Sequence, residues 1–388
     1  MIVAVVKATS EDEARVALVP ETCARLKKAG LDVLIETGAG TAAGFTDSEY
    51  ESAGARFASD AAAVYAEADA VVMVQTPTPD DVAKLRSGTM LFGVLSPLTQ
   101  HDFVRRLAEC GITAVSLDMM PRISRAQKMD VLSSMTTVSG YKSVLLAAGA
   151  LDKMFPMMMT AAGTITPAKV LVLGAGVAGL QAIATARRLG AVVESFDVRP
   201  AVKEQVQSLG AKFIEVDVPV EDAEDAGGYA KEMSEDFKKK EAALIAEHAA
   251  GSDVVISTAL IPGKPAPILI TTETVGKMRS GSVIVDLAAE GGGNCELTQL
   301  GETVHQGGVT ILGPKNLPAT VPFHASQMFS RNVGAFLLDL TKDGSVELNT
   351  DDECVTGTLV TQNGEIVNDR VRKVMGLEPL AQPQGSPA

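Results

Sequence analysis

A glycine-rich turn between an apolar run and an alanine-rich run constrains the fold of this chain more than any other feature. Residues 170–191 read VLVLGAGVAGLQAIATARRLGA, in which Gly174, Gly176 and Gly179 form the pattern GxGxxG. The apolar run before the glycines predicts a buried strand, and the alanine-rich run after them predicts a helix. In such a turn the first glycine permits the tight bend, the second lets a pyrophosphate approach the backbone, and the third lets the helix sit close to the sheet.

An acidic residue at the end of the next predicted strand strengthens a dinucleotide-binding interpretation. The run at 192–196 leads into Asp197, which lies 18 residues beyond Gly179, and the helix after the glycines offers free N–H groups to phosphates. A carboxylate there accepts hydrogen bonds from ribose hydroxyls and repels a 2′-phosphate, which favours NAD over NADP. Arg199 is the counter-argument, since an arginine in that position holds a phosphate. A domain of this fold that binds no nucleotide stays an alternative.

The rest of the chain alternates short β-rich runs with helical patterns, which predicts parallel sheets covered on both faces. With 388 residues, 46% of them hydrophobic and 21% charged, the chain is globular and long enough for two domains. The expected strands of the first series are residues 2–6, 32–35, 70–74, 90–95 and 113–116, with helices at 20–29, 47–53, 80–85 and 100–109. Those of the second series are 169–173, 192–196, 212–215, 253–257, 282–286 and 309–312.

Two helical segments set the expected domain boundaries. Residues 130–155 read as one long helix between the two series, and the amphipathic segment 323–340 follows the second sheet and is expected to pack back on the first domain. The prediction is an α/β protein with two Rossmann-like doubly wound parallel-sheet domains that flank a cleft, the first of them discontinuous. The expected domains are 1–135 with 320–375, then 136–319, followed by a disordered tail at 376–388.

Charge, cysteine spacing and hydropathy argue against several classes of protein. The formal net charge of −14 disfavours general nucleic-acid binding. The four cysteines form no CxxC pair and the four histidines stand in no metal-ligand spacing, so neither a disulfide scaffold nor a metal site is expected. No secretory signal is expected, and charged residues break the apolar stretch 143–164. The pairs at 80–81 and 351–352 are interpreted as solvated aspartates rather than acid/base couples.

A polar cluster at 121–134, PRISRAQKMDVLSS, is the second candidate functional segment. If the chain is helical from Gln127, then Gln127, Asp130 and Ser134 share one helix face. The bland interpretation is a solvated first turn with Asp130 near a cap. The functional interpretation is a polar wall facing the cleft, in which an amide such as Gln127 and a cation such as Arg122 suit a carboxamide or a pyrophosphate.

Two further segments have the composition of binding loops. EDAGGYAKEM at 224–233 places Tyr229 among glycines and polar residues, which suggests a mobile flap or only a long surface loop. STALIPGKPAP at 257–267 directly follows a predicted strand, and loops at the carboxyl ends of parallel strands line ligand crevices. Lys264 within it is either a surface charge or a phosphate contact.

These motifs together resemble a known family. PRISRAQKMD, FPMMMTAAGTITPAKVLVLGAGVAGLQAIATARRLGA, AGGYAKEM and TALIPGKPAP are similar to the NAD(H)-binding domain I of proton-translocating NAD(P) transhydrogenase, over about residues 1–375. The chain ends before any membrane helix, as in the form whose alpha subunit is split. The resemblance implies direct hydride transfer between NAD(H) on this chain and NADP(H) on a partner beta-subunit domain, coupled to proton movement through membrane-embedded subunits. It also implies a homodimer, located in the cytoplasm and peripherally associated with the inner membrane through those subunits.

The resemblance also implies roles for individual residues. The family's Arg-Gln-Asp loop corresponds to residues 122–130, and its mobile loop corresponds to 228–229. The implied catalytic residues are Arg122, Gln127, Asp130, Ser133 and Tyr229. The implied cofactor-binding residues are Arg125, Gly174, Gly176, Val177, Ala178, Gly179, Asp197, Val198, Arg199, Gly228 and Leu260. A glutamine that the family can carry corresponds to Glu241, which leaves that contact open. Hydride transfer between two nicotinamides needs no general base, which agrees with a site poor in titratable groups.

Alanine dehydrogenase is the alternative from another class of function. The chain resembles that family in outline, including EARVALVPE with Arg15. That family uses a lysine and a histidine in its first domain and an aspartate in its second, whereas Gln75, Ser96 and Glu290 align with them here. The substitutions remove the substrate carboxylate contact and the acid/base group. A module that binds NADH without catalysing transfer is the third hypothesis.

Overall fold

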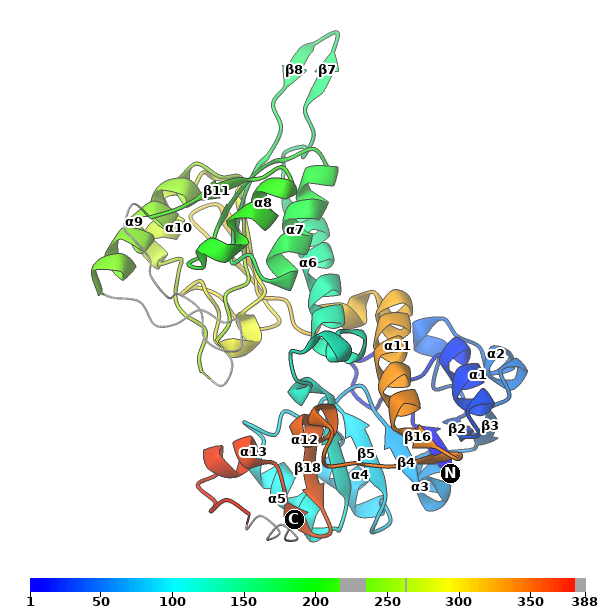
Figure 1. Ribbon diagram of the computed structural model, residues 1–388. Coiled ribbons are helices and arrows are strands. Elements are labelled where there is room, and N and C mark those ends of the chain that lie inside the picture. Colours follow the sequence, from blue (N-terminus) through cyan, green and yellow to red (C-terminus); the bar gives the residue numbers. More distant parts are fainter. Residues whose placement is uncertain (217–234, 262–263, 381–388) are drawn as a thin grey trace. The chain divides into compact units, whose positions relative to one another are not determined.

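Two units, each built on its own mainly parallel sheet, make up the chain (Figure 1). The computed structural model describes residues 1–216, 235–261 and 264–380. The first unit comprises Met1–Met135 and Ala319–Ala388, and the second comprises Thr136–Pro318. The predicted fold class, with two Rossmann-like sheets and a discontinuous first domain, is confirmed.

The first sheet has the strand order of a doubly wound fold with two added strands at one edge. Its parallel strands run in the order β3-β2-β1-β4-β5-β6, and their bounds are Arg56–Ala58, Asp32–Glu36, Ile2–Val5, Ala70–Val72, Met90–Gly93 and Thr113–Ser116. The C-terminal part of the chain adds β18 (Leu359–Gln362) antiparallel to β6, and β19 (Glu365–Ile366) antiparallel to β18. These two strands are one reason why the first unit takes chain from both ends of the sequence.

Helices cover both faces of the first sheet. They are α1 Pro20–Lys28, α2 Asp47–Ser52, α3 Ala61–Glu67, α4 Pro79–Lys84, α5 His101–Glu109, α11 Pro322–Leu340, α12 Glu353–Thr358 and α13 Asp369–Val374. As expected, α11 packs on the first unit. Its Ser330 hydroxyl accepts from the Val19 N–H (2.9 Å) and donates to Thr22 (2.7 Å), and Phe336 meets Phe92 edge to face. Ser330 is fully buried, so these bonds attach the helix to α1 at a fixed register.

The second sheet repeats the same order with one antiparallel edge strand. Its strands lie in the order β11-β10-β9-β12-β13-β15-β14, and their bounds are Lys212–Ile214, Val192–Phe196, Lys169–Leu173, Val254–Ser257, Val283–Asp286, Val309–Leu312 and Thr303–Gln306. Only β14 is antiparallel, paired with β15. The helices of this sheet are α7 Val177–Arg188, α8 Lys203–Ser208, α9 Glu235–Ala250 and α10 Thr272–Lys277.

Alternation along the strands divides the second unit's core into two layers. In β9, Val170 and Val172 pack with α7 and α8, whereas Leu171 and Leu173 pack with α9 and α10. All four side chains are at most 1% exposed. Because both faces of a parallel sheet are covered, such strands are apolar at every position rather than at every second one. This explains why β9 could be recognised from its sequence.

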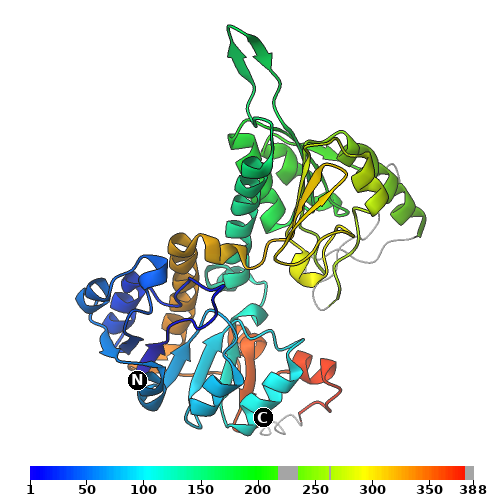
Figure 2. The ribbon, with the colours of Figure 1, turned by 180° about the vertical axis from the view of Figure 1, so that it is seen from behind.

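One helix and one hairpin stand apart from these layers. Helix α6 (Val131–Ala150) begins in the first unit and continues into the second without a break. It is followed by the hairpin β7–β8 (Met158–Thr160 and Gly163–Ile165), which projects from the helices of its unit in both views (Figures 1 and 2). All six strand residues of the hairpin are exposed.

Several short elements differ from the sequence prediction. The strands β3, β14, β18 and β19 and the short helices α3, α12 and α13 were not expected, and the first sheet has eight strands rather than five. The predicted helix 130–155 spans Val131–Ala150, and α11 begins at Pro322, one residue earlier than expected. β3, β14 and β19 are short edge strands with exposed positions, and β18 is short and half polar, so none of them has the continuous apolar run that marks the central strands. The predicted disordered tail lies largely outside the described residues.

Candidate nucleotide-binding site

The three glycines of the fingerprint follow β9 and open α7, and each has a different reason to lack a side chain. Gly174 has φ +94°, which favours glycine. A Cβ on Gly179 would lie 1.8 Å from the Gly174 carbonyl oxygen, so only hydrogen lets α7 pack this close to the turn. A Cβ on Gly176 would meet nothing within 4 Å. The open space beside Gly176 is a cradle that a side chain would fill, and it fits a diphosphate against the backbone.

The first turn of α7 presents its backbone N–H groups without a side-chain cap. The N-cap residue is Gly176, which has no side chain to accept a hydrogen bond from these N–H groups. Val177 is 43% exposed, and Ala178 is buried. Gly140 of α6 packs against this turn, because a Cβ there would lie 2.2 Å from the Ala178 carbonyl oxygen. Uncapped N–H groups and the partial positive charge of a helix N-terminus attract an anion. This end of α7 therefore suits the pyrophosphate of a dinucleotide.

Asp197 lies at the end of β10, where a ribose-binding acid is expected. Its Oδ2 accepts from the Ala175 N–H (2.7 Å), which ties the end of β10 to the glycine turn. Arg199 donates to both carboxylate oxygens, from Nε to Oδ1 (2.9 Å) and from Nη2 to Oδ2 (2.8 Å). Arg199 is thus paired with Asp197 in a bidentate ion pair. Val198 lies between them and is partly buried.

Replacing Asp197 with Ala tests whether this pairing sets cofactor choice. The change removes the carboxylate that is expected to accept from the ribose, and it releases the Arg199 guanidinium from its partner. NADH affinity should fall about tenfold, in line with the loss of one charge-assisted hydrogen bond, and discrimination against NADPH should relax. Equilibrium titration with both nucleotides measures the ratio. Asp197→Asn, which keeps an acceptor oxygen, is the matched control, and an unchanged NADH-to-NADPH ratio in the alanine variant refutes the assignment.

Glu241 on α9 is a titratable group beside Asp197. Burial, followed by the charge of Asp197, raises the pKa of Glu241 to about 7, while Lys238 acts in the opposite direction. Below that pH the group is neutral, and above it the site carries two neighbouring carboxylates. The residue lies at the position where the family resemblance left a contact in doubt.

The raised pKa of Glu241 predicts a pH dependence of nucleotide affinity. A dinucleotide is anionic, so protonating Glu241 removes a repulsive charge, and NADH should bind about three- to tenfold more tightly at pH 6 than at pH 8. Glu241→Gln is uncharged at both values and should show the tighter binding throughout. Isothermal titration across this range measures the effect. Equal pH profiles for the two proteins would show that Glu241 does not titrate near the ligand.

One buried side-chain amide forms hydrogen bonds to the loop after β12, which carries Leu260. Asn294 is fully buried, and its side chain accepts from the Ala259 N–H (3.0 Å) and donates to the carbonyls of Ala259 (2.9 Å) and Pro267 (2.8 Å). It therefore joins both ends of the 259–267 loop. Leu260 is 50% exposed, so its apolar side chain is available to a ligand. Residues 262–263 lie outside the described part of the chain, and Lys264 after them is exposed.

Asp286, at the end of β13, organises the turn that presents Asn294. The Asp286 carboxylate is fully buried and accepts five hydrogen bonds of 2.7–3.0 Å. The donors are the hydroxyls of Ser257 and Thr298 and the backbone N–H groups of Ala288, Asn294 and Cys295. A buried carboxylate is tolerated when its lone pairs are satisfied in this way. Neither Asp286 nor Asn294 was predictable as a site residue from the sequence, because neither belongs to a local motif.

The polar cluster at 121–134 folds differently from its predicted helix. Residues Ser124–Met129 form a 3-10 helix, η3, and Asp130 follows in an extended conformation (ψ 94°) before α6 begins at Val131. The prediction that Gln127, Asp130 and Ser134 share one helix face is therefore wrong. Gln127 is exposed and its side chain makes no hydrogen bond to the described residues, while Arg122 is also exposed. Both side chains are accessible to a ligand.

Asp130 caps the first turn of α6, as the bland interpretation proposed. Its carboxylate accepts from the Ser133 N–H (2.9 Å) and from the Ser133 hydroxyl (2.5 Å). An N-cap carboxylate satisfies N–H groups that the helix leaves unpaired. The expected site residues Arg122, Gln127, Asp130 and Ser133 thus lie together in the first unit, whereas the glycine turn, Asp197 and Leu260 lie in the second. That the two groups line one cleft stays a prediction.

Other expected residues fall elsewhere. Gly228 and Tyr229 lie outside the described residues.

The interpretation of the two aspartate pairs as solvated is half wrong. Asp81 is 8% exposed and lies in the first turn of α4, where its carboxylate accepts from the N–H and hydroxyl of the N-cap residue Thr78. The Asp352 side chain is 19% exposed and is itself the N-cap of α12. Both second aspartates therefore stabilise the start of a helix.

A small pocket opens in the first unit at the carboxyl ends of β1 and β4. It has a volume of about 230 Å³ and is lined by Glu13, Arg15 and Gln75, among others. Glu13 and Arg15 are both nearly buried and form a bidentate ion pair, with Nε–Oε1 and Nη2–Oε2 distances of 2.7 and 2.6 Å. This is the switch point of a doubly wound sheet, where ligands commonly bind. In this pocket the carboxylate of Glu13 compensates the charge of Arg15, and Gln75 is uncharged.

Comparison with known families places the chain. Models of the alanine dehydrogenase/PNT N-terminal and C-terminal domains match residues 4–139 and 143–369. The chain belongs to the alanine dehydrogenase/PNT family. It is 49% identical over 376 residues to the first part of NAD(P) transhydrogenase subunit alpha from Rhodospirillum rubrum, which covers 95% of this chain and 98% of that one.

Transhydrogenases are more similar to this member of the family than alanine dehydrogenases are. A solved transhydrogenase from Sinorhizobium meliloti superimposes with a TM-score of 0.83 at 43% identity, covering 95% of this chain and 99% of that one. Alanine dehydrogenase from Bacillus subtilis is 29% identical over 388 residues, covering 97% and 96% of the two chains. The resemblance inferred from the motifs is confirmed. Across the described residues no group of side chains could hold a metal ion, and no described helix is long and apolar enough to span a bilayer.

Proposed function

We propose that this chain is the NAD(H)-binding subunit of a proton-translocating NAD(P) transhydrogenase. It takes part in direct hydride transfer between NAD(H) bound here and NADP(H) bound on a partner subunit, which membrane subunits couple to proton translocation. The fit of the second unit to a dinucleotide carries this proposal, with the open backbone at Gly176 beside the acid Asp197. The 49% identity to a transhydrogenase alpha subunit distinguishes the reaction from others that use the same fold.

The residues around the turn would hold the cofactor, and those of the first unit would orient it. Gly174, Gly176, Val177, Ala178 and Gly179 would bind the pyrophosphate. Asp197, Val198 and Arg199 would bind the adenosine ribose, with Leu260 beside it. Bound NAD(H) supplies or accepts the hydride. Gln127 and Arg122 would contact its nicotinamide end, while Asp130 and Ser133 fix the start of α6 next to them. No group in this set has to accept a proton for hydride transfer between two nicotinamides.

The partners follow from the same assignment. The chain works in a complex with a beta subunit, whose NADP(H)-binding domain supplies the second nucleotide. Membrane-embedded transhydrogenase subunits hold the complex at the cytoplasmic face of the inner membrane. The roles that the resemblance implies for Gly228 and Tyr229 concern residues outside the described part of the chain.

A homodimer is supported by the apolar surface of the hairpin β7–β8. Five large apolar side chains on and before it are exposed, namely Met154, Met157, Met158, Met159 and Ile165, and Met159 is 80% exposed. A lone two-stranded hairpin is marginally stable in water, and a cluster of exposed methionines marks a protein contact. A second copy of the chain that packs on the hairpin would bury this surface.

Met159→Asp tests the dimer. A charge at the most exposed position of the hairpin should weaken the self-association constant at least tenfold, because burying an unpaired carboxylate in an apolar contact is unfavourable. Sedimentation velocity over a concentration series measures it. Lys28→Asp on α1, an exposed change in the first unit, is the control and should leave association unchanged. A wild-type monomer, or a variant that associates as tightly as the wild type, contradicts the dimer.

Reconstitution tests the proposed reaction. The purified chain is mixed with the NADP(H)-binding domain of a transhydrogenase, and reduction of an NAD analogue by NADPH is followed spectroscopically. Turnover that depends on both proteins is expected, and no turnover at any ratio of the two would reject the proposal. The same preparation is assayed for NADH oxidation with pyruvate and ammonia. Activity in that assay would instead support an alanine dehydrogenase that uses the pocket at Arg15 and Gln75.

A further inference from the structure

We propose that Arg125 and Lys128 are positioning residues, which fix Gln127 by clamping η3 to Asp339 and Asp352. The inference rests on the proposed function, because it assigns Gln127 to the nicotinamide end of the site. It differs from the family-derived expectation that Arg125 contacts the cofactor.

The three-residue period of a 3-10 helix sorts η3 into three faces. Residues at i and i+3 eclipse one another in this helix. Ala126 and Met129 form the inner face and are fully buried. Arg125 and Lys128 form a second face and point at acidic side chains. Ser124 and Gln127 form the third face and are both exposed. The six residues SRAQKM thus place two buried side chains, two side chains that form ion pairs and two exposed side chains on three different faces of η3.

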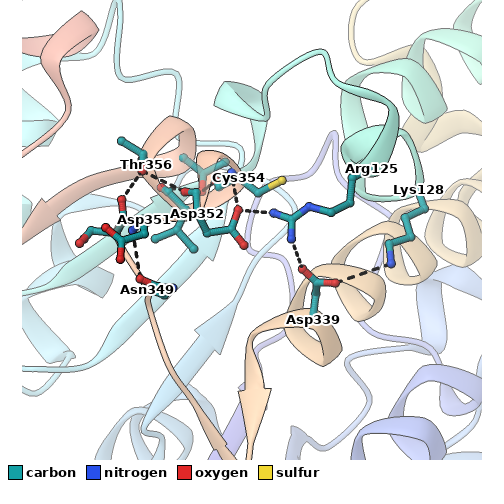
Figure 3. A network of polar contacts seen from close by, with 11 residues as sticks. Arg125, Lys128, Asp339, Asn349, Asp351, Asp352, Cys354 and Thr356 are labelled. Carbon is teal, nitrogen blue, oxygen red and sulfur yellow. Dashed lines mark hydrogen bonds and ion pairs between the residues drawn. The ribbon is translucent and has the colours of Figure 1, made fainter.

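The clamp consists of two carboxylates from two different helices (Figure 3). Asp339 of α11 lies 3.4 Å from Nη1 of Arg125 and 3.7 Å from Nζ of Lys128. Nη2 of Arg125 donates to Oδ1 of Asp352, which also accepts from the Cys354 N–H (2.8 Å) and so caps α12. The planar guanidinium suits such a bridge, since its N–H groups point in fixed directions.

The two helices that carry the carboxylates of the clamp are themselves held in place. The clamp can therefore fix the position of η3 within the first unit. Helix α11 is attached to α1 by buried hydrogen bonds, and α12 leads directly into strand β18 of the sheet. Asn332 of α11 adds a third attachment, because its Nδ2 donates to the Lys128 carbonyl (2.9 Å). A 3-10 helix of two turns is weak by itself, so its geometry depends on these contacts.

The clamp acts on geometry rather than on global stability. Its ion pairs are partly exposed, and pairs of that kind contribute little to the free energy of unfolding. The position of an orienting amide has a larger effect, because a displacement of about 1 Å in a reactive arrangement costs up to about 100-fold in rate. Arg125 is engaged by two carboxylates, which leaves its charge compensated within the protein.

A double-mutant cycle on Arg125 and Asp352 separates the two roles of the arginine. Asp352→Asn removes the ion pair but keeps a good N-cap for α12. Arg125→Gln, Asp352→Asn and the double variant are compared in single-turnover hydride transfer with the NADP(H)-binding domain, and in NADH titration. Each single variant should slow transfer about three- to tenfold, with NADH Kd within twofold of wild type. The double variant should be no slower than the slower single variant, since both break one clamp.

Other outcomes overturn the proposal. If Arg125→Gln weakens NADH binding fivefold or more while Asp352→Asn does not, the arginine touches the cofactor. Multiplicative effects of the two changes on rate would also contradict a shared clamp. Arg125→Lys, which keeps the charge but reaches fewer acceptors, should recover part of the rate. Glu21→Gln, which breaks the Arg331–Glu21 pair on the same helix α11, is the matched control and should leave transfer unchanged.

Hydrogen exchange distinguishes failure of the clamp from failure of the proposed function. Amides of residues 122–130 should exchange about tenfold faster in Asp352→Asn than in wild type or Glu21→Gln. Unchanged exchange there overturns the clamp whatever the activity. Faster exchange together with a wild-type chain that shows no transhydrogenation would uphold the clamp and reject the reaction.

Discussion

Gln127→Asn should slow hydride transfer on the order of 100-fold while NADH Kd stays within about twofold. The amide of Gln127 is exposed on the free face of η3 and makes no hydrogen bond to the described residues, so shortening it costs the fold nothing. One methylene withdraws the amide from a ring by more than 1 Å, which is enough to lose orientation without losing the many other contacts of a dinucleotide. Stopped-flow transfer with the NADP(H)-binding domain and NADH titration give the two numbers.

The neighbouring Ser124 provides the control for this prediction. It shares the exposed face of η3 but has no assigned contact, so Ser124→Ala should change neither rate nor affinity. Equal losses of rate and NADH affinity in Gln127→Asn would mean that the amide only holds the cofactor in the ground state.

Asp286→Ala should lower the free energy of unfolding by about 3–5 kcal/mol, the largest stability effect expected in the second unit. The change leaves five donors without their acceptor in a fully buried place. It also frees the turn that presents Asn294, so NADH affinity should fall with stability as the 259–267 loop loses its anchor. Denaturant titration of the purified variant, followed by far-ultraviolet circular dichroism, measures the loss.

Ser257→Ala is the graded counterpart. It removes one of the five donors and leaves the carboxylate with four, so about 0.5–1.5 kcal/mol is expected. If the two variants are equally stable, the network around Asp286 does not act as a unit and the larger prediction is wrong.

The central strands and the glycine turn were predictable because local sequence determines them. β9 is apolar at four consecutive positions, and Gly174 and Gly179 are required by backbone geometry within a few residues. The strands β18 and β19 were not predictable, since both are short and the place of β18 beside β6 depends on contacts more than 240 residues apart in sequence.

The same distinction holds for the candidate site. Asp197 follows from its spacing to the glycines, whereas Asp339 and Asp352 meet Arg125 only after α11 returns to the first unit. The 3-10 conformation of 124–129 was also missed, because Asp130 can cap a new helix as readily as it can sit inside one. Local motifs point to the candidate site residues, while the residues that hold them in place come from distant parts of the chain.

The two sheets share one strand order, which bears on how many nucleotides each chain binds. Both units present a first strand at the centre of the order, but the chain after β1 reads VKATSEDEAR and contains no glycine, and α1 begins only at Pro20. Of the two first strands, only β9 is therefore followed by a glycine turn that leaves room for a phosphate. Each polypeptide should saturate with a single equivalent of nucleotide, so the duplicated architecture does not carry a duplicated binding capacity.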